Sequence, residues 1–541
     1  MSMTRSGRYP QHRAPTGDGE TLCSPPWHEA EQLLSSNRDQ LAASSDDILG
    51  RSIRELSEAA RDAVLAAAKQ YTSSYADVEV TADSGVPFIL TGHQPGLVHP
   101  GVWLKNFAAA QLAKATGGMA ISLVIDSDLC RETSIRVPTG DTKQPRAEQV
   151  AFDISTAQMP FEERRIVDHA TWKSFGSKTA DTIAPLVDDP LIRQWWPEVV
   201  GSASAGDLLA PAFSQARHQL ELDWHSVSLE IPQSCVCQTA PFRWFAAALL
   251  GNAEKFRTAY NEALADYRRE HRLRNHAQPV PDLAADGDWT EAPFWIWSTE
   301  VPTRRALFVK STDDELLLTD RAGWNASLSW HPDGDGASAV EQLAQWESLG
   351  VKIRTRALVT TMFARLLLAD IFIHGIGGAK YDQVTDSICE RFFGFRPPAY
   401  LTLTGTLRLP ISHDSVPTEI ERQLRQALRD LRFHPEANLD FSTLDENDRQ
   451  RAEELVQQKL TWVRTTKTAD NAAERHRQIV ASNAAFTPWT APRRDQLEAE
   501  LQVSSSQLRA NQLLESREYP FCLFPRDQLH NFFLDFSSKM A

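Results

Sequence analysis

Two histidines, His93 and His99, lie in the segment TGHQPGLVHPG, between an apolar run that predicts a strand and an amphipathic run that predicts a helix. A parallel strand delivers such side chains to a ligand crevice at its carboxyl end. Imidazole can donate to phosphate oxygens or stabilise a developing negative charge without a metal. The backbone N–H groups of Gly92, Gly96 and Gly101 suit phosphate or carboxylate. The alternative is structural: both imidazoles cap the turn or bond buried carbonyls.

Two carboxylates follow the next apolar run. Residues 119–125 predict a second strand, and Asp126 and Asp128 are expected to project to one side at its end. There they would bind a substrate amine, hold Mg²⁺ with a phosphate, or hydrogen-bond a ribose. The alternative is a polar strand terminus or a helix N-cap. We predict that His93, His99, Asp126 and Asp128 are catalytic, because one βαβ unit brings them to the same edge.

A second glycine segment, GIGGAKY, is another candidate anion or nucleotide site. Gly375, Gly377 and Gly378 permit close approach of a ligand to the backbone, and Lys380 and Tyr381 follow them. An apolar helix is predicted to run into this loop, and a new helix to begin directly after the glycines. The alternative is a tight turn between two packed helices.

Positive charge also gathers on a long helix predicted over 244–275, where aromatic and apolar residues recur at spacings of three and four. Its charged face forms either a pocket for an acidic ligand or a solvated surface. The residues concerned are Arg257, Asn261, Arg268, His271, Arg272, Arg274 and His276.

The strand–helix–strand pattern that begins at residue 86 predicts an α/β fold to position these residues. The stretches EAPFWIWSTE and RRALFVK predict further strands, and REYPFCLFP predicts a strand that returns to the core. Charged, periodic sequence after residue 416 predicts a helical hairpin or coiled-coil arm. We expect a disordered tail (1–27), N-terminal helices (28–85), a core (86–415) with an insertion at about 138–345, a helical arm (416–515) and a C-terminal strand and tail (516–541).

Composition narrows the class of partner. The 541-residue chain has a formal net charge of −15, which argues against a long nucleic-acid interface because such an interface needs a basic face. Six cysteines without paired spacing suit a reducing cytoplasm. No apolar stretch approaches the roughly 20 residues needed to cross a bilayer, and the first residues lack the apolar middle of a secretory signal. We therefore expect a cytoplasmic protein that acts on a small molecule, without a nucleic-acid or membrane partner.

Three motifs resemble, in the same order, those of the bacillithiol-biosynthesis cysteine-adding enzyme family. TGHQPGLVHPGVWL is similar to the family's TGQQPGLFGGPLYT after its first strand. The sequence from Ile125 to Asp128 is similar to its acidic EDHD motif. IHGIGGAKYDQVTDSICERFFGFRPP is similar to its later glycine loop, tyrosine and helix ending in FG and a proline. Departures fall at His93, His99 and Ser127, where the family has other residues, and Gln94 is retained.

The resemblance implies a Rossmann-like core of the nucleotidylyltransferase or class I synthetase type, with an inserted connective domain and a coiled-coil extension. It implies a ligase that joins cysteine to an amino-sugar or similar amine in low-molecular-weight thiol biosynthesis. ATP or ADP is the implied cofactor, and no metal site is assigned. Within this family frame we expect Gln94, Gly92, Gly96 and Trp103 to bind substrate. No KMSKS-like lysine loop is found, so the standard synthetase activation is not indicated. The competing hypothesis is a non-catalytic nucleotide- or metabolite-binding protein that forms a homodimer through its arm.

Overall fold

The computed structural model describes residues 11–43, 47–78, 83–203, 206–275, 277–313, 315–331, 334–414 and 417–536. The chain forms two compact units. We call the larger unit, made of Met1–Val137, Glu148–Pro410 and Arg517–Ala541, the body. The smaller unit, made of Pro138–Ala147 and Ile411–Ser516, is the arm. His276 and residues 1–10 of the predicted tail lie outside the described residues.

A six-stranded sheet lies at the centre of the body. Its order in space is β1 (Thr21–Ser24), β18 (Tyr400–Gly405), β17 (Ile371–His374), β4 (Phe88–His93), β5 (Met119–Val124) and β10 (Leu229–Pro232). β1 is antiparallel to β18, and the other neighbours are parallel. Parallel strands are covered on both faces, which explains the nearly continuous apolar sequences of β4 and β5. The predicted α/β class is confirmed.

The strand order reverses beside β4. From β4 the chain runs to β5 and β10 on one side, and it later returns to β17 and β18 on the other. In open parallel sheets, ligands bind outside the carboxyl ends of the strands at such a switch point. α3 (Pro100–Thr116) leaves β4 and packs on β4, β5 and β18, whereas α12 (Ile376–Phe392) leaves β17 and packs on β17 and β18. The first turns of α3 and α12 therefore start from the two strands that flank the switch point.

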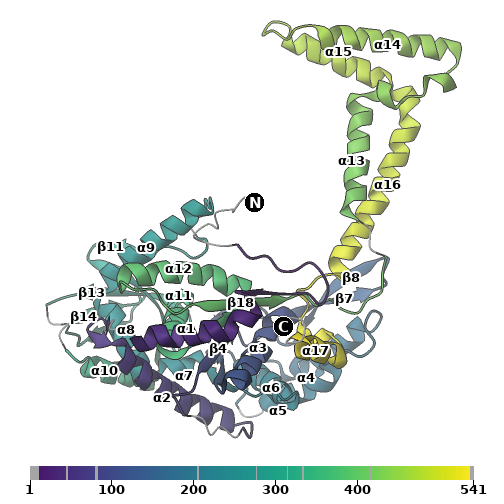
Figure 1. Cartoon of the computed structure of the whole chain (residues 1–541). Coiled ribbons are helices and arrows are strands. Elements are labelled where there is room, and N and C mark those ends of the chain that lie inside the picture. Colours follow the sequence, from purple (N-terminus) through teal and green to yellow (C-terminus); the bar gives the residue numbers. More distant parts are fainter. Residues whose placement is uncertain are drawn as a thin grey trace. The chain divides into compact units, whose positions relative to one another are not determined.

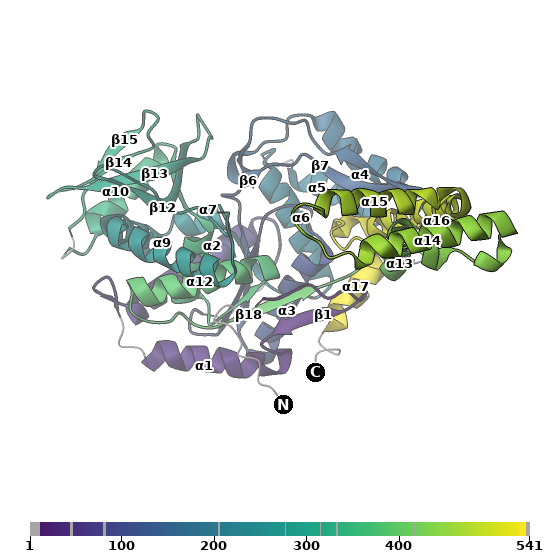
Figure 2. The ribbon, with the colours of Figure 1, turned by 90° about the horizontal axis from the view of Figure 1, so that it is seen from above.

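A second sheet is largely antiparallel and lies beside α9 and α10 (Figure 2). The strands predicted in EAPFWIWSTE and RRALFVK are confirmed as β12 and β13. The long helix predicted over 244–275 is divided into α8 and α9 at Asn252, whose backbone leaves the helical region (φ −119°, ψ 25°). The elements are β11 (Ala285–Asp286), β12 (Trp289–Ser298), β13 (Arg305–Ser311), β14 (Leu316–Thr319), β15 (Asn325–Leu328), β16 (Val351–Thr355), α8 (Ala240–Gly251), α9 (Ala253–Glu270) and α10 (Ala337–Ser348).

Further helices surround the central sheet, and the described part of the chain contains none long and apolar enough to span a membrane. The helices are α1 (Ala30–Ala43), α2 (Ile53–Ser73), α4 (His169–Ile183), α5 (Ile192–Ala203), α6 (Leu209–Asp223), α7 (Gln233–Cys237), α11 (Ala357–Phe363), a π-helical turn (Ala364–Leu368) and α17 (Arg526–Leu534). The short strands are β2 (Asp47–Ile48), β3 (Arg51–Ser52), β6 (Leu129–Cys130), β7 (Ser134–Gly140), β8 (Pro145–Ala151) and β9 (Met159–Pro160).

The arm is helical, as its charged periodic sequence predicts. α13 (Thr418–Phe433) packs along α16 (Thr487–Leu514), and α14 (Glu446–Arg464) packs along α15 (Ala472–Ala485) (Figure 1). Few large side chains of α13 and α14 are buried, so the apolar contact between the paired helices is small. Ion pairs within the exposed surfaces of α13 and α14 accompany this contact.

Three sequence predictions need correction. Thr21–Ser24 is an edge strand and not disordered, because its backbone pairs with distant β18. REYPFCLFP forms a 3-10 turn (Phe521–Leu523) followed by α17, since Pro520 and Pro525 lack the N–H groups that a strand would use. The apolar segment before GIGGAKY is not one helix: it ends in strand β17, and α12 already begins at Ile376, so its glycines lie in a helical turn.

Candidate functional site

A pocket of about 460 Å³ lies outside the carboxyl ends of β4 and β5. It gathers three of the residues singled out in the sequence, Gln94, Gly96 and Asp128. One part of its wall is apolar and the other polar. The apolar lining includes Leu97, Val98, Phe152, Phe161 and Phe213, and the polar lining includes Arg131, Glu132 and Ser134. A pocket of this size and mixed polarity suits a small polar metabolite.

The Asp128 carboxylate is held at the pocket from two directions. Gln94 Nε2 donates to Asp128 Oδ2 at 2.6 Å, and Arg304 Nη1 donates to Asp128 Oδ1 at 3.0 Å. The guanidinium of Arg304 also lies over the ring of Trp295, 4.5 Å from its centroid. The Asp128 side chain nevertheless remains 39% exposed, so its oxygens are accessible to a ligand that donates hydrogen bonds.

Asp126 has a different environment from Asp128. β5 ends at Val124, so the alternation expected of a strand does not extend to the two aspartates. Asp126 is buried, and it accepts hydrogen bonds from Ser234 N at 3.0 Å and Ser234 Oγ at 2.5 Å in the first turn of α7. Burial raises the pKa of Asp126, and the bonds from Ser234 oppose that rise. The two carboxylates therefore do not project to one side, and Asp126 caps α7.

His93 is locked inside the body. Its Nδ1 lies 2.9 Å from Gln94 O and its Nε2 lies 2.6 Å from Arg217 Nη1. Because a guanidinium only donates, Nε2 accepts and Nδ1 carries the proton. Burial, together with the charges of Arg217 and Lys105, holds the pKa of His93 well below its usual value. Both ring nitrogens of this neutral imidazole are occupied.

Arg217, on α6, is the centre of a buried polar cluster at this edge of the sheet. It pairs with Glu221 at 3.2 Å and with Glu230 on β10. Burial raises the pKa of Glu230 to about 8, although the Arg217 charge opposes that rise. Trp103 Nε1 donates to Glu221 at 2.6 Å and is fully buried among aromatic rings, which gives the predicted substrate-binding tryptophan a place in the core.

His99 is the N-cap of α3. Its Nδ1 accepts from Gly101 N at 3.1 Å, and its carbonyl accepts from Val102 N at 3.0 Å. A Cβ on Gly101 would lie 2.1 Å from Gly405 O, so glycine is needed for the close approach of α3 to the end of β18. Burial lowers the pKa of His99 to about 4, with help from the charge of Arg517. The geometry matches the structural alternative for this histidine.

The glycine segment after β17 is built differently. Gly375 is the N-cap of α12, and no side chain caps the helix or places an acid in its first turn. A Cβ on Gly375 or Gly377 would meet no atom within 4 Å, whereas one on Gly378 would lie 2.8 Å from His374 Nδ1. Lys380 is exposed, and Tyr381 is partly buried against the core. Among the described residues, no side chain is seen to accept from the first N–H groups of α12.

His374 was not singled out in the sequence. It is the last residue of β17, is 4% exposed, and its Nε2 lies 2.6 Å from Asp382 of α12. Arg365 and Thr361 also hold the Asp382 carboxylate, and the pKa of that carboxyl lies far below its usual value because of His374 and Arg365, which overcome its burial. The sequence signal was a histidine eight residues before an aspartate across a strand–helix junction.

Lys105, which sequence reasoning also missed, is a lone cation in the apolar part of α3. It is 4% exposed, and its Nζ donates to Gly92 O at 2.9 Å. Burial, reinforced by the Arg217 charge, lowers the pKa of Lys105 to about 8. The available signal was a lysine within GVWLKNFAAAQ, a stretch in which only Asn106 and Gln111 are otherwise polar.

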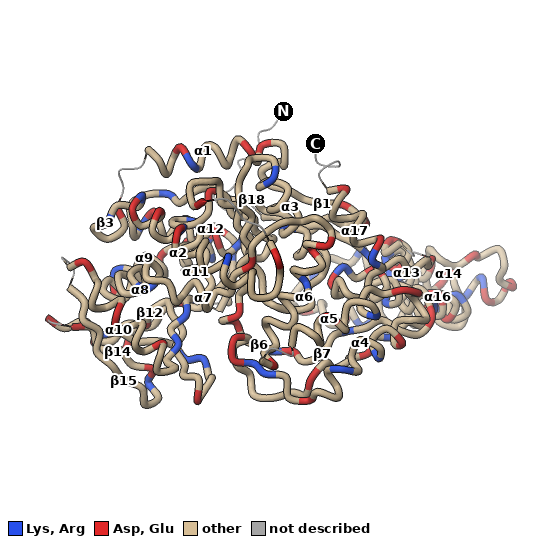
Figure 3. Tube along the Cα trace, turned by 90° about the horizontal axis from the view of Figure 1, so that it is seen from below, with Lys and Arg blue, Asp and Glu red and all other residues tan. Residues whose placement is uncertain are grey.

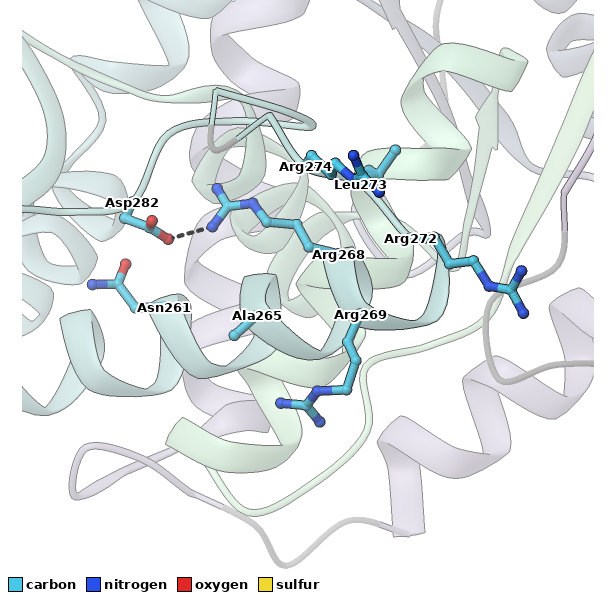
Figure 4. A pocket seen from close by; sticks show the side chains of 8 residues that line it. All are labelled: Asn261, Ala265, Arg268, Arg269, Arg272, Leu273, Arg274 and Asp282. Atoms are coloured by element: carbon cyan, nitrogen blue, oxygen red, sulfur yellow. Dashed lines mark hydrogen bonds and ion pairs between the residues drawn. The ribbon is translucent and has the colours of Figure 1, made fainter. Parts of the chain in front are cut away.

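The arginine-rich region of α9 does form a hollow of about 660 Å³. Figure 4 shows that its cations do not converge, since Arg269 and Arg272 point in different directions. Arg268 is occupied by Asp282 at 2.7 Å and by the carbonyls of Gln278 and Val280. This arrangement favours the solvated-face alternative.

Along the described chain, Lys and Arg residues are interspersed with Asp and Glu residues (Figure 3). Within the described residues, no group of three or more His, Cys, Asp or Glu side chains is placed to hold a metal ion.

No protein-family profile matches the chain, and no curated protein matches it.

Proposed function

We propose that the protein is a ligase of the cysteine-adding type, which joins an amino acid to an amino-sugar or similar amine in low-molecular-weight thiol biosynthesis in the cytoplasm. The observation that carries the proposal is the Asp128 carboxylate, which Gln94 orients in the lining of a pocket at the carboxyl edge of a parallel sheet. The order of the parallel strands supports a Rossmann-like core. The three ordered sequence motifs support the family assignment.

In this proposal Asp128 binds the amine of the substrate. An ionised carboxylate accepts charge-assisted hydrogen bonds from an ammonium group, and Gln94 and Arg304 fix its orientation beforehand. His93 acts through position and not as a free base, because both of its nitrogens are bonded. His93 Nδ1 donates to the backbone carbonyl of Gln94, and the side chain of Gln94 in turn orients Asp128.

A nucleotide cofactor fits one of the two glycine segments better than the other. The first turn of α3 is closed by His99, whereas the first turn of α12 has no side-chain cap. The residues that would hold a phosphate of ATP or ADP are therefore Gly375, Gly377, Gly378 and Lys380. Bound there, a nucleotide would supply activation of a carboxyl group for amide formation.

The test of the amine site is ligand binding to Asp128→Asn. Mass spectrometry of small molecules retained by the purified protein, followed by thermal shift with cysteine, amino sugars, ATP and ADP, identifies the ligand class, because a ligand stabilises the state that binds it. We expect Asp128→Asn to weaken amine binding roughly tenfold or more, as for hydrogen bonds to charged groups. Asp223→Asn, an exposed change at the end of α6, is the matched control. Equal binding by Asp128→Asn and the wild type would refute the assignment.

A second candidate is a metabolite-binding protein without catalysis, which dimerises through a coiled-coil arm. It is favoured by the occupied nitrogens of His93 and by exposed apolar side chains on the arm, among them Phe433 and Val503. The discriminating measurement is the mass of the full chain in solution with Val503→Glu. A ligand that binds without turnover, together with loss of a dimer in this variant, would favour the second candidate.

A further inference from the structure

The pocket that Asp128 lines has an aromatic wall, formed by Phe152, Phe161 and Phe213. Each of these three side chains is at most 8% exposed. The ring of Phe152 lies edge-on to that of Phe213, with their centroids 5.3 Å apart, and both rings pack on Trp172 of α4. Rings that are packed against other rings in a protein interior have little freedom to move. The wall therefore presents preformed apolar surface to a ligand.

Backbone hydrogen bonds fix the aromatic wall beside the charged side of the pocket. Phe161 N donates to Asp128 O at 2.9 Å, and Phe152 N donates to Thr133 O at 2.9 Å. The segment from Asp128 to Ser134 supplies the charged side chains of the lining, so one aromatic residue is bonded near each of its ends. A ligand that contacts the Asp128 carboxylate is therefore next to an apolar surface.

The neutral polar side chains of the lining are already engaged. Among the described residues that line the pocket, these are Gln94 and Ser134. Gln94 Nε2 donates to Asp128, and Ser134 Oγ donates to Gln149 Oε1 at 3.1 Å. A polyhydroxylated sugar placed on the aromatic wall would leave hydroxyl groups without hydrogen-bond partners, which weakens binding. A hydrocarbon group placed there would gain free energy by leaving water.

We propose that the amine bound by Asp128 carries a large apolar group, such as a phenyl ring, which packs on the aromatic wall. The Asp128 carboxylate holds the ammonium end, and Gln94 orients that carboxylate. The wall shields the apolar end from water. The inference rests on the proposed function, from which it takes Asp128 as the amine-binding group, and it selects among the amines that this function allows. It requires neither a nucleotide nor amide formation.

The experiment is calorimetric titration of the full chain with two aromatic amines, phenethylamine and phenylalanine. Ethylamine and alanine are their counterparts without the ring, and glucosamine represents the amino sugars. We expect at least one aromatic amine to bind, and to bind roughly tenfold or more tightly than its counterpart and than glucosamine, because burial of a phenyl group has about this effect on an affinity.

Either aromatic amine agrees with the proposal, and their comparison defines the ligand further. Tighter binding of phenylalanine identifies an amino acid, whose carboxylate the exposed Arg131 of the lining would receive. Tighter binding of phenethylamine identifies an amine without a carboxylate. The proposal is overturned if neither aromatic amine binds, or if glucosamine or the counterpart without the ring binds equally well.

A substitution in the lining tests where the aromatic amine binds. Leu97→Ser removes apolar surface at a partly buried position and should weaken this binding roughly fourfold or more, the effect of about one buried methylene group. Leu349→Ser, the same change at a side chain that is 79% exposed and outside the lining, should bind like the wild type. Equal binding by Leu97→Ser and the wild type would overturn the proposal. If Leu97→Ser does not fold, the comparison of ligands on the wild type decides.

These readouts separate the inference from the proposed function. Asp128-dependent binding of glucosamine, without binding of either aromatic amine, would refute the inference and leave the proposed amine site standing. Asp128-dependent binding of an aromatic amine that forms no amide when ATP and cysteine are added would refute the ligase and leave the inference standing. Equal binding of the aromatic amine by Asp128→Asn and the wild type would refute both.

Discussion

The first turns of α3 and α12 begin beside neighbouring strands of one sheet, yet they are finished in opposite ways. In α3, His99 caps Gly101 N and its carbonyl accepts from Val102 N, while Pro100 has no N–H to satisfy. In α12, Gly375 offers no side-chain cap. A first turn whose N–H groups are hydrogen-bonded within the protein stabilises the fold. A first turn whose N–H groups are not bonded keeps these donors for a ligand.

The histidines before the two helices repeat this difference. His93 uses both ring nitrogens in hydrogen bonds within the protein, whereas His374 has its Nε2 2.6 Å from the Asp382 carboxylate. Similar sequence, a histidine near glycines after an apolar strand, therefore produces an imidazole held by an arginine at β4 and one held by an aspartate at β17. Residue types alone do not distinguish the two; their partners do.

The largest expected effect comes from removing Arg217, the centre of the buried polar cluster beside β4. Arg217→Met should leave Glu221 and Glu230 buried without their cation and remove the donor to His93, at a cost of about 3–5 kcal/mol in the free energy of unfolding. Thermal or urea unfolding measures the loss. Arg193→Met on α5, which removes an exposed pair with Asp181, is the control and should cost no more than about 1 kcal/mol. Similar losses in the two variants would show that the cluster does not stabilise this edge.

A second prediction compares one substitution at equivalent positions of the two helices. Gly101 and Gly377 are each the second residue of their helix. Gly101→Ala should destabilise by about 1–3 kcal/mol, because its Cβ would meet Gly405 O. Gly377→Ala, which meets no atom, should stabilise by up to about 1 kcal/mol, because alanine loses less conformational entropy on folding.

The shift in melting temperature checks the pair directly, since both proteins differ from the wild type by one methyl group. Shifts of the same sign would mean that the two helix starts are not the contrasting structures described above.

The predictable parts of the molecule are those whose pattern is local. β4, α3 and β5 follow from an apolar run, a glycine-containing turn and a second apolar run, and the arm follows from charged helical periodicity. β1 is different: the tetrapeptide TLCS becomes a strand only because β18 presents an edge to it. β17 is hidden within a longer apolar segment that also suits a helix.

The candidate site shows the same limit. Gln94 and Asp128 were predicted individually, but their hydrogen bond depends on β5 ending at Val124, which turns Asp126 toward α7. Arg217 is 124 residues from His93 in the chain, so no local pattern could indicate that it occupies the imidazole. A buried lysine in an apolar helix is visible in the sequence, but its lack of a counter-charge is visible only in three dimensions.

The smallest expected effect at neutral pH concerns the cap itself. His99→Ala should cost about 1 kcal/mol, as for loss of other N-caps, whereas His99→Asn should retain the cap.

Capping requires neutral His99, because Nδ1 accepts from Gly101 N. The folded-state pKa of about 4 lies below the unfolded value near 6.5, so the unfolded chain binds the additional proton between these values and stability falls as pH drops through that window. Asparagine does not titrate, and the stability of His99→Asn should therefore decline less steeply than that of the wild type from about pH 6.5 to about pH 4. Urea unfolding across this range measures both slopes. Parallel slopes would show that His99 does not cap α3 through a neutral ring, and the contrast between a closed α3 and an open α12 would then lose its main support.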